Sequence, residues 1–154
     1  MSDTDDIDVL ARTLWAEARG EGEAGMVAVA AVIMNRCRAA ADYRRRKPGK
    51  SRHVLFGDGS PASACQMPWQ FSCWNQDDPN RGKLLAVTSD DPWFAAALRI
   101  AAQAVAHELV DPTGGATHYV RHDWVSRTAW TKTPDGAPRS PTAKIGNHWF
   151  YLPT

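Results

Sequence analysis

Residues Ala11–Arg36 read ARTLWAEARGEGEAGMVAVAAVIMNR and join two helical patterns through an acidic, glycine-rich segment. Before the glycines, apolar residues recur at the i, i+3, i+4, i+7 spacing, which predicts an amphipathic helix capped by Asp5 or Asp6 and ended by the glycines. After them, residues 23–40 are apolar on almost all sides, which predicts a helix through the centre of a small domain. The stretch therefore predicts a helical core.

The middle of the chain contains a long irregular segment and one further long helix. Residues 42–80 are rich in glycine, proline, serine and charge, which indicates irregular structure or short pieces. Next, Asp90 or Asp91 can cap a helix with Pro92 in its first turn, and strong helix formers continue to Leu109. A loop as long as the one before this helix is usually functional.

The end of the chain predicts a little extended structure. The segments ATHYV (116–120) and HWFYL (148–152) are aromatic and β-branched, as in strands or extended loop edges. A chain of 154 residues fits one domain. We therefore expect a mainly α fold (α+β), with residues 1–154 as a single domain, a core of about residues 7–152 and a small β or loop-rich end.

Charge and cysteine content limit the classes of partner and ligand. The net charge is +1, yet an acidic N-terminal stretch precedes a basic run, Arg36 to Arg52, that suits a nucleic acid, an anionic lipid or an anionic wall polymer. The three cysteines form no CxxC pair, which argues against a zinc site. Three free thiols are expected, with a Cys65–Cys73 disulfide as the alternative in an oxidising compartment.

The N-terminus lacks the charged-then-apolar pattern of a secretory signal, and no run approaches the roughly 18 apolar residues of a membrane span. We therefore expect synthesis in the cytoplasm and no stable membrane insertion.

Tryptophan is unusually frequent for a chain of this size. Seven occur, mostly in segments predicted to be loops, and as a group they favour a platform for flat ligands such as sugar rings. For any single indole, packing between loops is the alternative. They are Trp15, Trp69, Trp74, Trp93, Trp124, Trp130 and Trp149.

The glutamates at the end of the first helix are candidates for acid catalysis. At 100° per residue, Glu21 falls near the centre of the apolar stripe and Glu17 near its edge. A carboxyl beside apolar side chains loses hydration, which raises its pKa and suits it to act as a general acid. Alternatively, both face water at a frayed helix end beside Arg19 and Arg36. Periodicity alone leaves the two interpretations open.

Four segments, in order, carry a family resemblance. EARGE with the AVAAVIMNR that follows, CQMPWQFSCW (65–74), DPTGGATHYV (111–120) and KIGNHWFY (144–151) resemble the motifs of the SleB/CwlJ-type cell-wall hydrolases. The resemblance spans nearly the whole chain. It implies a compact, lysozyme-like and lytic-transglycosylase-like fold that acts on the glycan strands of peptidoglycan, with no cofactor or metal.

The resemblance also implies roles for individual residues. Glu17 corresponds to the catalytic acid, Gln70 to a glutamine beside the sugar at the cleavage point, and Tyr119 to a tyrosine that closes the site. Loop packing is the alternative for Gln70, and a core position for Tyr119. The other expected substrate-binding residues are Phe71, Ser72, His118 and Trp149, and the expected supporting residues are Glu21, as a brace or cap, and His148. For His148 and Trp149, a structural place in an aromatic strand is the alternative.

Two reactions remain open for such a site. One glutamate suffices for a lytic transglycosylase, whereas a muramidase-type hydrolase needs a second carboxylate to assist water. Asp77, Asp78 and Asp111 lie in predicted loops with nothing to fix them near Glu17, which favours the transglycosylase.

Two non-catalytic readings compete with these reactions. They are a peptidoglycan-binding module and, much less favoured, a nucleic-acid binder, so no nucleic-acid partner is expected. The missing signal suggests a phage or prophage lysis or virion enzyme that meets the wall from the periplasm or the outer face, with a bacterial remodelling enzyme as the alternative.

Overall fold

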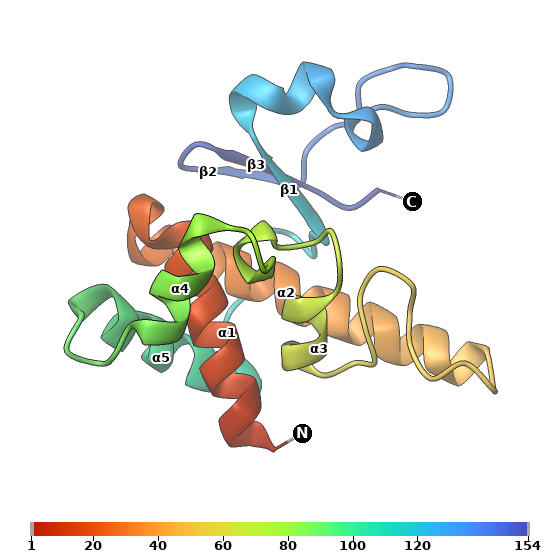
Figure 1. Cartoon of the computed structure of the whole chain (residues 1–154). Coiled ribbons are helices and arrows are strands. Elements are labelled where there is room, and N and C mark those ends of the chain that lie inside the picture. Colours follow the sequence, from red (N-terminus) through yellow and green to blue (C-terminus); the bar gives the residue numbers. More distant parts are fainter. Residues whose placement is uncertain (1, 154) are drawn as a thin grey trace.

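The structure is a computed structural model that describes residues 2–153. Helices packed on one another carry a small three-stranded sheet on one side (Figure 1), which confirms the expected mainly α architecture. The helices are α1 Asp3–Ala18, α2 Gly22–Arg46, α3 Pro61–Gln66, α4 Pro79–Ala86 and α5 Pro92–Val105. The strands are β1 His118–Arg121, β2 Ala143–Ile145 and β3 His148–Tyr151, and the 3-10 turns are η1 Arg19–Glu21, η2 Ser72–Trp74, η3 His122–Arg127 and η4 Ala129–Thr131.

Helix α1 begins before the predicted caps. Ser2 is the N-cap, and its hydroxyl accepts a hydrogen bond from the Asp5 backbone N–H at 3.3 Å, so the prediction of Asp5 or Asp6 as cap is wrong. Asp6 is buried instead and accepts a hydrogen bond from the Ala62 backbone N–H of α3 at 3.1 Å. Serine with an extended backbone is a preferred N-cap residue, because its hydroxyl accepts a hydrogen bond from a backbone N–H of the first turn. Asp6 is therefore free to connect α1 to α3.

The other long helices differ from their predicted ends. Helix α2 continues to Arg46, beyond the apolar segment that ended the prediction near residue 40, because arginine is a good helix former and favours the C-terminal end of the helix dipole. Helix α5 ends at Val105, four residues before Leu109, and His107 takes a left-handed backbone with φ +60°. The predicted irregular segment contains α3 and η2 as short pieces.

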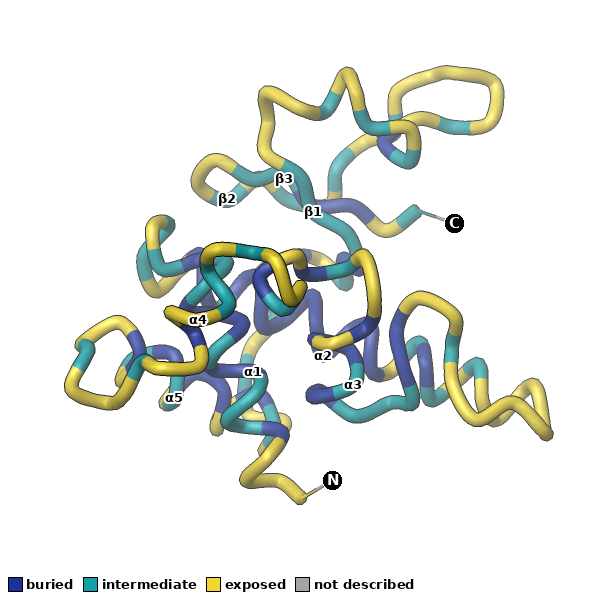
Figure 2. Tube along the Cα trace, viewed as in Figure 1, coloured by how far each residue is buried: buried dark blue, intermediate teal, exposed yellow. Residues whose placement is uncertain are grey.

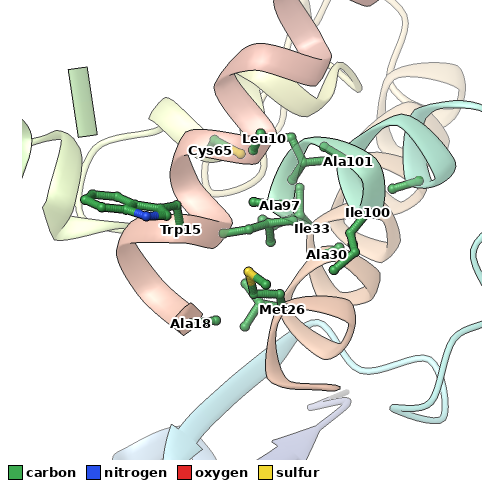
Figure 3. Close-up of a cluster of buried hydrophobic side chains, with 14 of the residues drawn as sticks. Leu10, Trp15, Ala18, Met26, Ala30, Ile33, Cys65, Ala97, Ile100 and Ala101 are labelled. Carbon is green, nitrogen blue, oxygen red and sulfur yellow. The ribbon is translucent and has the colours of Figure 1, made fainter. Parts of the chain in front are cut away.

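The core lies where α1, α2 and α5 meet. Leu10 of α1, Met26 and Ile33 of α2 and Ile100 of α5 are at most 1% exposed. Figure 3 shows these side chains together with small alanines, which let the helix backbones approach closely. Figure 2 shows the corresponding buried stretches running through the helical part, with exposed chain at the loops.

The N-terminal helical stretch Asp3–Arg46 also contains an 18-residue window apolar enough, by length and composition, to cross a membrane. By length and composition, this window corrects the expectation that no segment approaches a membrane span. A core helix and a signal sequence share such a composition, and 72% of the window is buried inside this fold. Its burial is that of a core helix.

The sheet has the order β1-β3-β2 and is antiparallel throughout. Both predicted strands are present, whereas β2, only three residues long after a proline-containing segment, was not predicted. Tyr119 pairs with Phe150, and Phe150 packs with Ala28 and Val32 of α2. The sheet face that carries Tyr119 is therefore the one that meets the helices.

Candidate active site

Glu17 lies in the last turn of α1, immediately before η1, and is half-buried. Burial raises the pKa of its carboxyl above the ordinary value, and the negative charge of Asp78 raises it further. Hydrogen bonding from the Cys73 thiol and the Tyr119 hydroxyl and the charge of Arg36 lower the pKa, but the net direction is upward. A carboxyl in this environment can hold its proton at a pH where an exposed glutamate is ionised.

Arg36 is the buried centre of the site, with 6% of the residue exposed. Its Nε donates to the Thr117 carbonyl at 2.7 Å, and its Nη1 donates to Gln70 Oε1 at 3.3 Å. The guanidinium also lies over the rings of Phe56 and Phe71, at 5.4 and 5.3 Å from their centroids. One side chain of α2 thus fixes both the loop that carries Gln70 and the chain entering β1.

Tyr119 approaches Glu17 from the sheet. Burial raises the pKa of its hydroxyl well above the ordinary value, and the charge of Glu17 adds to this, so the hydroxyl remains a hydrogen-bond donor at any physiological pH. Its ring lies 5.1 Å from that of His148 and 5.7 Å from that of Phe150. Helix α1 and the sheet therefore present their polar groups to one another at this point.

Glu21 joins the turn after Glu17 to the sheet. Its carboxylate accepts hydrogen bonds from the Asn147 side chain at 3.1 Å and the Asn147 backbone N–H at 3.4 Å, and His148 Nδ1 lies 3.9 Å away. A Cβ placed on Gly146 would lie 2.6 Å from Glu21 Oε2. Through these contacts, Glu21 is placed to brace η1 against the turn between β2 and β3.

Gly146→Ala tests this brace. The new methyl would meet the flexible end of Glu21 and weaken its exposed hydrogen bonds to Asn147, so we expect a loss of up to about 1 kcal/mol beyond the backbone penalty. Gly136→Ala is the matched control, because Gly136 also has positive φ but nothing within 4 Å of its Cβ position. Thermal melts of both variants measure the difference, and equal losses would show that the contact contributes nothing.

Two other expected substrate-binding residues lie on the opposite face of the sheet. Side chains alternate along a strand, so His118 and Trp149 point away from Tyr119. His118 packs against Trp130 at 4.9 Å between ring centroids, and burial together with the charge of Arg36 lowers its pKa to about 4, which keeps it neutral. Lys144 Nζ lies 3.8 Å from the Trp149 ring centroid.

The structure thus brings some expected site residues together and leaves others apart. Glu17, Gln70, Phe71 and Tyr119 gather around Arg36, with Phe71 itself buried. Ser72 is exposed at the start of η2, and Glu21 and His148 contact each other at the edge of the group. Trp149 lies across the sheet, whereas His118, on the same sheet face as Trp149, still borders the group through the ring of Phe56, 6.0 Å away between centroids.

Three residues next to Glu17 were not assigned to the site from the sequence, namely Arg36, Cys73 and Asp78. Arg36 was instead considered as a surface partner of the glutamates. Asp78 was expected to be unfixed, but it is the N-cap of α4 and accepts a hydrogen bond from the Asn80 backbone N–H at 2.8 Å. The pair Asp78-Pro79 is a helix-start signal that was available in the sequence. Asp111 is also held, by hydrogen bonds from Asn35 of α2 and from Thr113 and Gly115 of its own loop, but it is not among the groups that act on the pKa of Glu17.

The structure offers no obvious metal centre. Within residues 2–153, no group of three or more His, Cys, Asp or Glu side chains is arranged to hold a metal ion. The three cysteines are buried free thiols, and burial raises the pKa of Cys37 and of Cys65 to about 12. Neither of these two thiols ionises near neutral pH, so they are packing residues rather than nucleophiles.

Comparisons with known proteins identify the family and the fold. The family model described as "Cell Wall Hydrolase" matches residues 20–151, beginning just after Glu17. The solved catalytic domain of the germination-specific lytic transglycosylase SleB from Bacillus anthracis is 26% identical, with a TM-score of 0.61 over 97% of this chain and 95% of that one. The SleB catalytic domain from Bacillus cereus is 25% identical, with a TM-score of 0.59 over 96% and 89%. The comparison with curated proteins found no match. Since the family model covers most of the sequence, the chain belongs to the cell wall hydrolase family.

Proposed function

We propose that this protein cleaves peptidoglycan glycan strands between N-acetylmuramic acid and N-acetylglucosamine, as a lytic transglycosylase with Glu17 as its acid. The observation that carries the proposal is the Glu17 carboxyl, whose pKa is raised by burial beside three groups that favour its anion, Cys73, Arg36 and Tyr119. Family membership supports a cell-wall substrate, and the similarity to SleB, described as a lytic transglycosylase, supports the reaction type.

The same surroundings suit both halves of the reaction. Neutral Glu17 donates its proton to the glycosidic oxygen as the bond from that oxygen to C1 breaks and C1 gains oxocarbenium character. The carboxylate left behind accepts hydrogen bonds from Cys73 and Tyr119 and faces the charge of Arg36. It then takes the proton of the muramic 6-hydroxyl as that oxygen bonds to C1, which yields a 1,6-anhydro end and restores neutral Glu17.

A clearing assay tests the proposal. The purified protein should reduce the turbidity of a suspension of purified peptidoglycan in a time-dependent way, without added metal. Sedimentation with peptidoglycan without any clearing would instead identify a non-catalytic binding module.

A second candidate reaction is hydrolysis of the muramidase type. Asp78 favours it, because this carboxylate is fixed at the start of α4 and is close enough for its charge to raise the pKa of Glu17. In that reaction, Asp78 would take the proton from a water that attacks C1, and the product would be a reducing end.

Asp78→Asn separates the two reactions. Asparagine caps a helix as well as aspartate, so the fold should persist. For a transglycosylase we expect activity within about tenfold of wild type. Its alkaline limit should move to lower pH, because Glu17 loses a neighbour that raises its pKa. A loss of about 10²-fold or more would assign Asp78 as the base for water. Asp90→Asn is the matched control for both the rate and the pH profile, because Asp90 is exposed, precedes the Asp91 cap of α5 and lies outside the site.

A further inference from the structure

The loop before Gln70 contains a strained turn. The Gln70 backbone N–H donates to the Met67 carbonyl at 3.3 Å, with Pro68 and Trp69 as the two central residues. Trp69 has φ +70°. Proline followed by a residue of positive φ is the pattern of a type II turn, whose second central position favours glycine or asparagine. A bulky residue in this conformation costs on the order of 1–3 kcal/mol.

Packing of the Trp69 side chain does not offset this strain. Trp69 is 92% exposed, whereas the other exposed tryptophans, Trp93 and Trp124, are 45% and 51% exposed. A tryptophan normally contributes through the large area that it buries, and Trp69 buries almost none. A strained backbone that holds an aromatic ring in solvent is the arrangement of a ligand contact rather than of a packing residue.

The position of Trp69 identifies the kind of ligand. It directly precedes Gln70, which Arg36 holds beside the Glu17 group. With Pro68, Asn75 and Asp77 it lines a hollow of about 290 Å³. An apolar ring face next to an amide and a carboxylate matches a pyranose, which has an apolar face and a rim of hydroxyl and acetamido groups.

We propose that Trp69 is a stacking platform for one sugar ring of the glycan strand, in a subsite beside the cleavage point, with Asn75 and Asp77 bonding its polar rim. The turn geometry holds the indole in solvent before the glycan strand binds. Less conformational entropy is therefore lost on binding. The inference rests on the proposed function, since it takes the glycan strand as the ligand.

The test measures glycan binding and stability together. The probe is a soluble tetrasaccharide of alternating N-acetylglucosamine and N-acetylmuramic acid, titrated into Glu17→Gln protein so that it is not cleaved. In the Glu17→Gln protein, a second substitution Trp69→Gly should raise the Kd for the tetrasaccharide at least about fivefold. Trp69→Phe keeps a flat ring, so its Kd should stay within about threefold of that of the Glu17→Gln protein. The melting temperature of Trp69→Gly should not fall, because glycine relieves the positive φ.

Trp93→Ala is the matched control for removing an exposed indole, since Trp93 lies in the first turn of α5 in a separate hollow with Glu23 and Ala96. Its Kd should not change. An unchanged Kd for Trp69→Gly would overturn the subsite, and a lower melting temperature with unchanged Kd would assign Trp69 a structural role instead.

Measuring peptidoglycan cleavage by the wild-type protein, together with the Kd values, distinguishes a wrong subsite from a wrong proposed function. Cleavage of peptidoglycan by wild type with a Kd independent of Trp69 would refute the subsite alone. Trp69-dependent binding without any cleavage by wild type would refute the proposed reaction and leave the subsite standing. Neither binding nor cleavage would refute both.

Discussion

Glu17→Gln should lower kcat/KM for peptidoglycan cleavage by about 10²- to 10⁴-fold, the range that a general acid contributes. Glutamine keeps the size of the side chain and its hydrogen bonding with Cys73 and Tyr119 but has no proton to give. Initial rates of clearing of a peptidoglycan suspension measure the effect. Activity above a few per cent of wild type would contradict the assignment of Glu17.

The stability of the same variant provides a check on its fold. Because the pKa of Glu17 is raised in the folded state, the native protein binds more protons than the unfolded chain between the ordinary glutamate pKa and the raised one. Wild-type stability therefore falls as pH rises through that window. Glu17→Gln removes this penalty and should be at least as stable as wild type at neutral pH, with the advantage disappearing below about pH 4.

Glu23→Gln is the matched control for activity. Glu23 belongs to the same acidic segment but is exposed and pairs with Arg99 on the surface. Its replacement should leave the cleavage rate within about twofold of wild type, because Glu23 is not among the groups that act on Glu17. The loss of a surface ion pair also changes the stability of the fold little. If both variants lost activity equally, the loss would reflect the charge of the segment rather than a particular acid.

Arg36→Met should destabilise the protein by about 3 kcal/mol, since it removes charge-assisted hydrogen bonds from buried partners. The Thr117 carbonyl loses its bond to Nε, Gln70 loses its bond to Nη1, and Glu17 loses a neighbouring positive charge. For a chain of this size, that loss corresponds to roughly 6–12 °C in melting temperature. Denaturant unfolding measures the free energy directly.

Arg45→Met is the control for this variant. Arg45 pairs with Asp42 on the exposed end of α2, so its removal should change the free energy of unfolding by less than about 1 kcal/mol. A loss of under 1 kcal/mol for Arg36→Met as well would show that the buried guanidinium does not hold the site together.

The fold was predictable where one pattern dominates a long segment. The apolar stripe of α1, the apolar stretch of α2 and the proline-capped start of α5 each depend on neighbours in the sequence, and each helix was predicted. Strand β2 was not, because its three residues acquire their conformation by pairing with β3. Helix ends were displaced wherever a tertiary contact or a competing cap decided them, as Ser2 did for α1.

The site was predictable only in part for the same reason. The order of the motifs indicated that Glu17, Gln70 and Tyr119, which lie far apart in the sequence, belong to one site. The structure shows that Arg36 links them, by its own hydrogen bond to Gln70 and by its place beside Glu17 and Tyr119. That Trp149 faces away from Tyr119 follows from strand register, which no motif specifies. The nearness of Asp78 follows from how α4 packs on α1.

Mass spectrometry of the fragments released from purified peptidoglycan tests the central claim most directly. A lytic transglycosylase that uses Glu17 as acid and base should release fragments ending in 1,6-anhydro-N-acetylmuramic acid, one water lighter than the corresponding reducing ends. The Glu17→Gln protein should release none above background. Fragments with ordinary reducing ends only, or equal release by the variant, would contradict the account.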